Sequence, residues 1–421
     1  MAIDPSGPKR IRVYREPNGS FATDHTGTLG DFADLPVVDG SVNLTLNKPM
    51  ESPRHMQQDL DSQSAKVHLP KSATLSFQCN LETFTTKSGD GVTAVENAVG
   101  TLFRSGLGHV NLGVGDTISD VSPSASSFDV ATIARWGVGY GIGVVDSGSF
   151  YVSEIKSISS STITLSPTLP VTPSNGATLY NPATYYLGND IGSDTDSVQM
   201  ILEGSKTTDK FLLLGGQWSG PPTFDLQNGQ IPKVTFNYTF ADWLYQSETT
   251  GLSATALASA TYTAIRQVVV NDSYLFTGIS PGTTHASQIG FTLGTQYARV
   301  TSPGNAAAVN NTLQWIRTRG QGPVVSGSFV TEWNSQDFFA QRDAVGDQTD
   351  IVLFQMGSVS GANGGGVALS APSVQYTDVQ LQDVDGIRSL NVKWEGTTDQ
   401  NSSKSTPVAD LESAAFKVHM F

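Results

Sequence analysis

Residues 219–242 read SGPPTFDLQNGQIPKVTFNYTFAD, and residues 370–395 read SAPSVQYTDVQLQDVDGIRSLNVKWE. Each segment has a small residue and a proline, a short strand-like run, a turn that ends in Gly229 or Gly386, and a longer alternating run. Alternation of apolar and polar residues is typical of a strand that buries one face. Because the same order of features occurs twice, the sequence predicts two copies of one β fold.

Further alternating runs extend this pattern along the chain. The clearest is 73–81 (ATLSFQCNL), in which Ala73, Leu75, Phe77, Cys79 and Leu81 share one face. Strands are also predicted over 42–46, 234–240, 324–333 and 387–394. Residues 91–105 have apolar side chains at helical spacing and predict one amphipathic helix. We therefore expect an all-β fold with at most one short helix in each half.

The composition agrees with that fold class. Charged residues make up 15% of the 421 residues, and 42 residues are glycine. A globular protein usually has about 25% charged residues, and a helical bundle or coiled coil would be richer in charge. The aromatic and aliphatic content excludes a wholly disordered chain.

The net charge of −14 argues against a basic nucleic-acid-binding surface over the whole molecule. Cys79 is the single cysteine, which excludes an intrachain disulfide and a cysteine-based zinc site. The first 20 residues lack the apolar segment of a signal peptide, and no run of about 20 apolar residues predicts a membrane helix. We expect a protein made in a reducing cytosol, without a membrane partner.

The chain divides into two predicted domains. Residues 1–245 form the first and include a small inserted β module at 112–187, where short strands alternate with turns. Residues 246–262 are small and polar and predict a linker. Residues 263–421 form the second domain. A polar stretch between Leu46 and His68 predicts a long hairpin arm, because unstructured loops of this length are usually functional or disordered.

The glycine-rich run GVGYGIG at 137–143 is the most conspicuous candidate motif. A phosphate-binding loop needs a helix N-terminus after its glycines, and no helix pattern follows here. The period-two spacing of the glycines predicts instead a strand that packs closely on a neighbour.

No other pattern predicts chemistry. The aspartates at 190–196 and 383–385 lack the spacing of a calcium loop and are interpreted as turn residues. The six histidines show no ligand spacing, and no nucleophile motif occurs. The tryptophans could form a sugar platform, but core packing is more common. We therefore expect no catalytic, cofactor or metal site, and no enzyme.

The order of features resembles that of tail tube (major tail) proteins of long-tailed bacteriophages. The resemblance is carried by ATLSFQCNL followed by a helix, by GPPTFDLQNGQIPKVTFNYTF, and by APSVQYTDVQLQDVDGIRSLNVKWEG. It covers most of 35–110, 195–245 and 320–396 and implies β-sandwich or barrel domains whose edge strands pair with neighbours to close a ring. The usual subunit has one such domain, whereas this chain carries two.

The resemblance implies a structural virion protein of the tail, assembled in the host cytoplasm. Three copies would form a pseudo-hexameric ring, and rings would stack into a tube that contacts other tail proteins. DNA would pass through the lumen during ejection without specific binding, and an acidic or neutral lumen suits that passage. The arm would contact the adjacent ring through Met50, Met56 and Leu60 as apolar anchors, with Glu51 and Arg54 as polar partners.

Two other classes of function stay open. One is a carbohydrate-binding or adhesive β-sandwich on a virion or cell surface, which would need clustered exposed tryptophan or tyrosine. The other is a β-rich hydrolase, which would need paired carboxylates in one cleft.

Overall fold

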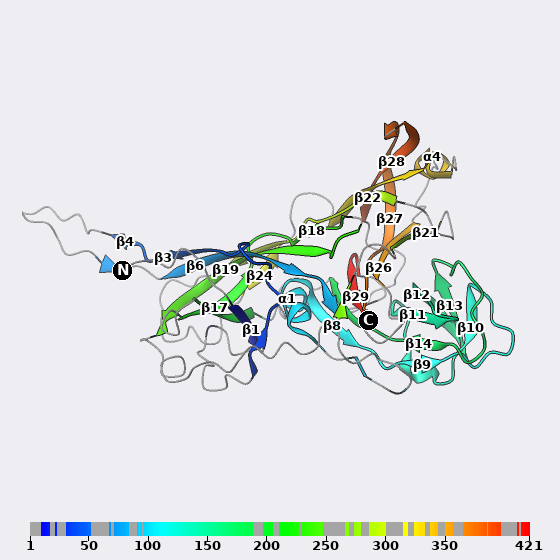
Figure 1. The fold of residues 1–421 in the computed structure, drawn as a ribbon, viewed down its shortest axis with the longest axis horizontal. Helices are drawn as coiled ribbons and strands as arrows, with labels where there is room; N and C mark the ends of the chain where they lie inside the picture. Colours follow the sequence, from blue (N-terminus) through cyan, green and yellow to red (C-terminus); the bar gives the residue numbers. More distant parts are fainter. Residues whose placement is uncertain are drawn as a thin grey trace, which may run out of the picture.

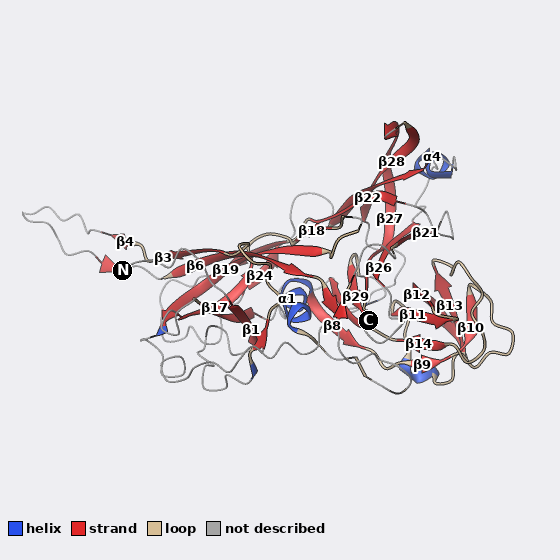
Figure 2. Ribbon diagram, viewed as in Figure 1, coloured by secondary structure: helices blue, strands red, loops and turns tan. Residues whose placement is uncertain are grey.

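The structure is a computed structural model of the 421-residue chain. It describes residues 10–16, 22, 31–51, 67–68, 71–83, 91, 93–94, 96–187, 197–204, 210–227, 229–246, 266–268, 273–278, 286–299, 315–318, 324–332, 337–343, 350–357, 365–384, 386–396, 411 and 414–421. The described part is mostly β, which confirms the predicted all-β class (Figure 2). The predicted linker at 246–262 lies almost wholly outside the described residues.

The first half of the chain supplies an eight-stranded antiparallel sheet, in which the strands run in the order β2-β1-β16-β17-β19-β6-β3, and β18 also pairs with β19. The strands are β1 (Arg10–Glu16), β2 (Ala33–Asp34), β3 (Asn43–Asn47), β6 (Ser72–Asn80), β16 (Ser197–Glu203), β17 (Lys210–Trp218), β18 (Thr223–Asp225) and β19 (Lys233–Tyr245). The predicted strands 42–46, 73–81 and 234–240 are confirmed within a few residues.

The second half supplies most of a nine-stranded antiparallel sheet, in which the order is β22-β25-β28-β27-β29-β15-β8, and β26 pairs with both β21 and β27. The strands are β21 (Tyr274–Thr277), β22 (Ala286–Leu293), β25 (Val325–Glu332), β26 (Asp350–Gly357), β27 (Gly366–Val384), β28 (Ile387–Gly396) and β29 (Lys417–Met420), with β8 (Gly108–Leu112) and β15 (Ala183–Leu187) from the first half. The predicted strands 324–333 and 387–394 are confirmed. The C-terminal strand β29 therefore joins the two halves of the chain.

The two sheets share one topology. In the first, six strands lie in the order β1, β16, β17 with β18, β19, β6, β3; in the second, the order is β21, β26, β27, β28, β25, β22. The chain visits these strands in the same sequence in both halves. An aromatic pair even occupies the same place: Trp218 lies opposite Tyr238 in one sheet, and Tyr376 lies opposite Trp394 in the other. The repeated order of features in the sequence thus has a counterpart in strand order, and we refer to the two as repeat 1 and repeat 2.

Each repeat has one described α-helix, and it follows the equivalent strand. Helix α1 (Ala98–Leu107) comes after β6, and α4 (Asp337–Asp343) comes after β25. The prediction of a helix over 91–105 was wrong at its start, because Asn97 caps the helix by accepting a 2.6 Å hydrogen bond from the Gly100 amide. Gly108, with φ 93°, ends it.

The inserted module forms a six-stranded sheet of its own, in the order β10-β13-β12-β11-β14-β9. It contains β9 (Asp116–Thr117), β10 (Ser127–Asp129), β11 (Gly141–Asp146), β12 (Ser149–Ser159), β13 (Thr162–Ser166), β14 (Thr178–Tyr180) and a short 3-10 turn, η2 (Ile133–Arg135). Its strands enclose a separate apolar core. The module leaves the main body between β8 and β15, which pair with each other (Figure 1).

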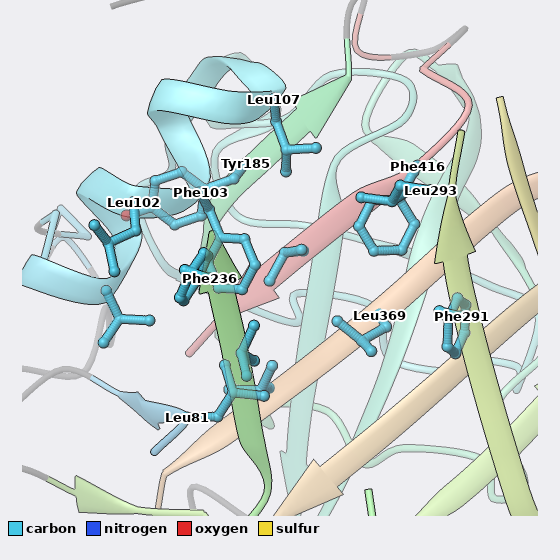
Figure 3. Close-up of a cluster of buried hydrophobic side chains, with 14 of the residues drawn as sticks. Leu81, Leu102, Phe103, Leu107, Tyr185, Phe236, Phe291, Leu293, Leu369 and Phe416 are labelled. Carbon is cyan, nitrogen blue, oxygen red and sulfur yellow. The ribbon is translucent and has the colours of Figure 1, made fainter. Parts of the chain in front are cut away.

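Repeats 1 and 2 share one continuous hydrophobic core. Figure 3 shows part of it, where Phe103 of α1 lies near Phe236 of β19, and Phe416 lies near Phe291 of β22. Phe416 is completely buried and contacts Phe224 of β18 at 6.2 Å and Phe291 at 5.9 Å between ring centroids. The segment before β29 therefore seals the boundary between the repeats.

Candidate assembly surfaces

On β3, β6 and β19, the face of repeat 1 that points away from the core is mainly polar and carries little charge. On β16 and β17 the same side is apolar, because Ile201, Leu212 and Leu214 pack on Phe32 there. One row across three strands is Thr45, Thr74 and Thr239, and the next is Asn43, Ser76 and Asn237. These side chains alternate with buried ones such as Phe77 and Phe236, so this part of the face consists mainly of hydroxyl and amide groups, with Lys233 at its end. Such a face offers hydrogen bonds but little fixed charge.

The corresponding face of repeat 2 has the same character with a few charges. Asn391 lies opposite Gln380 on one neighbouring strand, and Ser326 lies opposite Glu395 on another. Lys393 forms an exposed ion pair with Asp378 at 3.2 Å, so its positive charge is balanced locally. No excess of basic side chains lies on these described strand faces.

The predicted arm begins as a hairpin that continues β3 and β6. Strand β4 (Met50–Glu51) pairs with β5 (Val67–His68), and Met50 is 54% exposed. In Figure 1 this hairpin stands away from the body of the protein. Arg54, Met56 and Leu60 lie outside the described residues, so of the five predicted contact residues the structure places only Met50 and Glu51.

Repeat 2 has a hairpin at the same place in its strand order, which the sequence analysis missed. Strand β23 (Gln296–Arg299) follows β22 and pairs with β24 (Trp315–Thr318), which precedes β25. Strand β23 lies beside β17 of repeat 1. The equivalent hairpin of repeat 1, formed by β4 and β5, projects instead into the surroundings. The repeat in the sequence could have predicted this second hairpin, because it lies at the position in repeat 2 that the arm has in repeat 1.

A buried polar cluster fastens the inserted module to the main body. Lys417 of β29 is fully buried; its ammonium group donates to Glu154 Oε2 at 2.6 Å and to the Gly139 carbonyl at 2.8 Å. His419, two residues on and also buried, lies 3.2 Å from Glu154 Oε1 through Nε2 and 2.9 Å from Thr184 Oγ1 through Nδ1. Three separate strands, β12, β15 and β29, thus meet in one network.

The charges of this cluster follow from its surroundings. Burial alone would raise the pKa of Glu154, but the Lys417 charge and the hydrogen bond from His419 outweigh burial and lower that pKa to about 2. Burial lowers the pKa of His419, which favours the neutral imidazole. A neutral ring that donates from Nε2 and accepts at Nδ1 fits both of its partners.

The acid–imidazole–hydroxyl order of Glu154, His419 and Thr184 is one that hydrolases also use. Here all three side chains are buried, and Lys417 already holds the carboxylate. The geometry therefore serves as a cross-link between strands. The sequence analysis missed it, although FKVHMF at 416–421 alternates as a strand does.

Gln355 of β26 makes a second fastening. Its side-chain oxygen accepts from the Val152 amide, and its nitrogen donates to the Phe150 carbonyl, both at 2.8 Å. Phe150 also packs edge-on against Phe421 at 5.2 Å. The module is inserted in the first half of the chain, but it is also docked on strands of the second half.

The glycine run at 137–143 explains the close approach in this region. Gly141 and Gly143 lie in β11. A Cβ added at Gly141 would come within 2.4 Å of the His419 ring, and one added at Gly143 would come within 2.6 Å of the Phe150 ring. Gly137 and Gly139 precede the strand, and Gly139 has φ 82°. The predicted close packing is confirmed for the last two glycines, whereas the first two belong to a turn.

The other candidate groups fall into the core or outside the described part. Trp136, Trp218 and Trp394 are buried, and Lys71 covers the ring of Trp243 at 4.7 Å. The aspartates of 190–196 lie outside the described residues. Among the residues that are described, no group of three acidic, histidine or cysteine side chains could hold a metal ion, and no helix is long and apolar enough to cross a membrane.

Compared with the models of known protein families and with curated proteins, the sequence matches none of them. The class that the fold defines is thus a two-repeat antiparallel β protein with an inserted β module.

Proposed function

We propose that this protein is a structural subunit of a tube, of the kind formed by the tail tube proteins of long-tailed bacteriophages. The observation that carries the proposal is the presence in one chain of two sheets with the same six-strand order, each with polar side chains on the outer face of several neighbouring strands. Such a chain supplies two equivalent wall segments, so three copies would give a ring with approximate sixfold symmetry.

The open faces support a lumen that lets DNA pass. Thr, Ser, Asn and Gln side chains in repeat 1 offer neither the phosphate attraction of a basic channel nor the stacking of an aromatic platform. In this proposal rings stack into a tube within the virion tail, the projecting hairpin β4–β5 contacts another subunit, and other tail proteins bind the tube ends. The protein acts without a cofactor and is not an enzyme.

The test is direct imaging of the purified protein. We expect electron micrographs to show rings or tubes with a central channel, and averaged end views to show sixfold features with threefold true symmetry. Isolated particles of 44.6 kDa at all protein concentrations would contradict the proposal.

A carbohydrate-binding or adhesive β-sandwich is the alternative. It would need exposed aromatic rings in a cluster, whereas the described tryptophans are mostly core residues. A glycan-binding assay on the same preparation separates the two functions.

A further inference from the structure

Within the chain, β18 of repeat 1 contacts β22 of repeat 2. Each of these two strands has an equivalent in the other repeat. Register defines the equivalent positions. In repeat 1 a row of facing residues runs through Leu44, Leu75, Tyr238 and Trp218; in repeat 2 the matching row runs through Phe291, Gly327, Trp394 and Tyr376. Strand β3 is thus equivalent to β22, and Leu44 is equivalent to Phe291.

The same register relates the other side. Phe224 of β18 lies opposite Val234, and Leu381 of β27 lies opposite Leu390. Val234 lies four residues before Tyr238, and Leu390 lies four residues before Trp394, so the two positions are equivalent. Strand β18 is therefore equivalent to the distal part of β27, and Phe224 to Leu381.

Within the chain, β18 of repeat 1 lies beside β22 of repeat 2. Phe224 and Phe291 both pack on Phe416, and Phe291 is only 5% exposed. This contact is directional, because the β18 side of one repeat meets the β22 side of the next.

The two remaining sides have no such neighbour among the described residues. Strand β3 pairs only with β6, and Gln380–Val384 of β27 pair only with β28. Helix α4 packs on β27, and Arg342 donates to the Val379 carbonyl, but Leu381, two residues further on, is 55% exposed. Leu44 and Leu46 are half-buried at the edge of β3. Exposed apolar side chains on an uncovered strand edge are typical of an association surface.

We propose that β3 of one copy lies along Gln380–Val384 of β27 in a second copy, and so repeats between chains the contact that β22 and β18 make within the chain. The inference rests on the proposed function and names the surface by which its subunits meet. Leu381 then faces Leu44 and Leu46 across the boundary, on the core side of the joined sheets. A head-to-tail contact of this kind uses a different surface on each partner, so it continues until the ring closes.

Disulfide cross-linking tests this pairing. On the open face, Asn43 and Thr45 of β3 should lie near Gln380 and Gln382 of β27, which gives four double-cysteine variants of the full chain. The native Cys79 is fully buried and burial raises its pKa, so it should not compete. The matched control is Thr223→Cys with Thr292→Cys, at the equivalent positions within the chain.

After mild oxidation of the assembled protein, we expect at least one of the four variants to shift most of the 44.6 kDa band to multiples of that mass. The control pair should cross-link only within the chain. An equimolar mixture of Thr45→Cys and Gln380→Cys single variants should give a dimer that neither gives alone. A dimer from one single variant alone would show a symmetric contact and overturn the proposal.

Hydrogen exchange on the unmodified protein tests the same pairing without cysteine substitutions, so it remains informative if the cysteine variants fail to assemble. We expect slower exchange in 43–47 and 380–384 on assembly, and no change in β13 of the inserted module. Rings that form without protection in either segment and without cross-links would overturn this pairing but leave the proposed tube intact. A protein that never forms rings would instead overturn both.

Discussion

Leu44 of β3 and Phe291 of β22 hold equivalent positions in two sheets of the same topology, but only Phe291 is covered within the chain. Phe291 packs on Trp394 at 5.3 Å and on Phe416 at 5.9 Å. Leu44 is half-buried at a sheet edge. Phe291 thus contributes to the core of the folded chain, whereas Leu44 leaves part of its apolar surface exposed.

This difference predicts opposite results from the same substitution. Leu44→Lys should change the free energy of unfolding by only about 1 kcal/mol, because the long side chain can reach water, but it should abolish rings. Phe291→Lys should lower the free energy of unfolding by more than about 3 kcal/mol, because it places a charge in the core. Chemical denaturation and electron microscopy give the two readouts. Normal rings from Leu44→Lys would contradict the prediction.

The arm gives the second prediction. Joining Glu51 to Val67 through Asn-Gly should leave a folded subunit, because β4 and β5 already pair at that point and Asn-Gly favours a tight hairpin turn. If the arm joins successive rings, this variant should form single rings and no long tubes. Tube length in micrographs is the measurement, and a Met50→Ser variant of full arm length is the milder companion. Long tubes from the shortened variant would show that the arm does not join successive rings.

The third prediction concerns the ion pair of Glu154 and Lys417. Glu154→Gln should lower the free energy of unfolding by about 3–5 kcal/mol, because it leaves the Lys417 ammonium buried without its counter-charge. Removing the exposed pair through Lys393→Gln should cost less than about 1 kcal/mol. Equal costs for the two variants, measured by denaturation, would contradict the burial argument.

The fourth prediction is a pH dependence at His419. Its folded-state pKa lies below the unfolded value, so its contribution to stability is present above about pH 6.5 and lost as the pH falls below that value. His419→Gln can keep both hydrogen bonds, from its amide nitrogen to Glu154 and from Thr184 to its oxygen, and does not titrate. Below pH 6.5 the free energy of unfolding of the variant should therefore rise relative to that of the wild type, by at most about 1.4 kcal/mol per pH unit. A difference that does not change between pH 8 and pH 5 would show that His419 is not buried in the neutral form.

The last prediction tests the open polar face as a lumen wall. Asn237→Lys with Ser76→Lys places two positive charges side by side in repeat 1. Tubes should still form, because these side chains point away from the core, but they should bind DNA fragments and lose them as salt is raised. Ser122→Lys with Thr172→Lys, at two exposed positions of the inserted module, is the control for the same added charge. Equal DNA binding by both variants would place the Asn237 face outside the lumen.

The sequence by itself determined the strands, because a period of two decides which side chains share a face. The runs around Phe77, Phe236 and Val392 became buried strands as predicted, and the repeated turn at Gly229 and Gly386 marked two equivalent hairpins. The length and polarity of 47–67 predicted a hairpin arm, and the pairing of Met50–Glu51 with Val67–His68 confirms the base of that hairpin. The helix start was misplaced, since periodicity extends past the Asn97 cap.

Only the tertiary structure decided how these parts are joined. Glu154 and Lys417 are 263 residues apart, and nothing local to either predicts that they meet. Strand β29 pairs with β15 on one side and β27 on the other, which brings the two halves into one sheet and draws the inserted module onto the second. Pairing between distant strands depends on edges, register and shared burial, which are properties of the assembled sheet and not of any one segment.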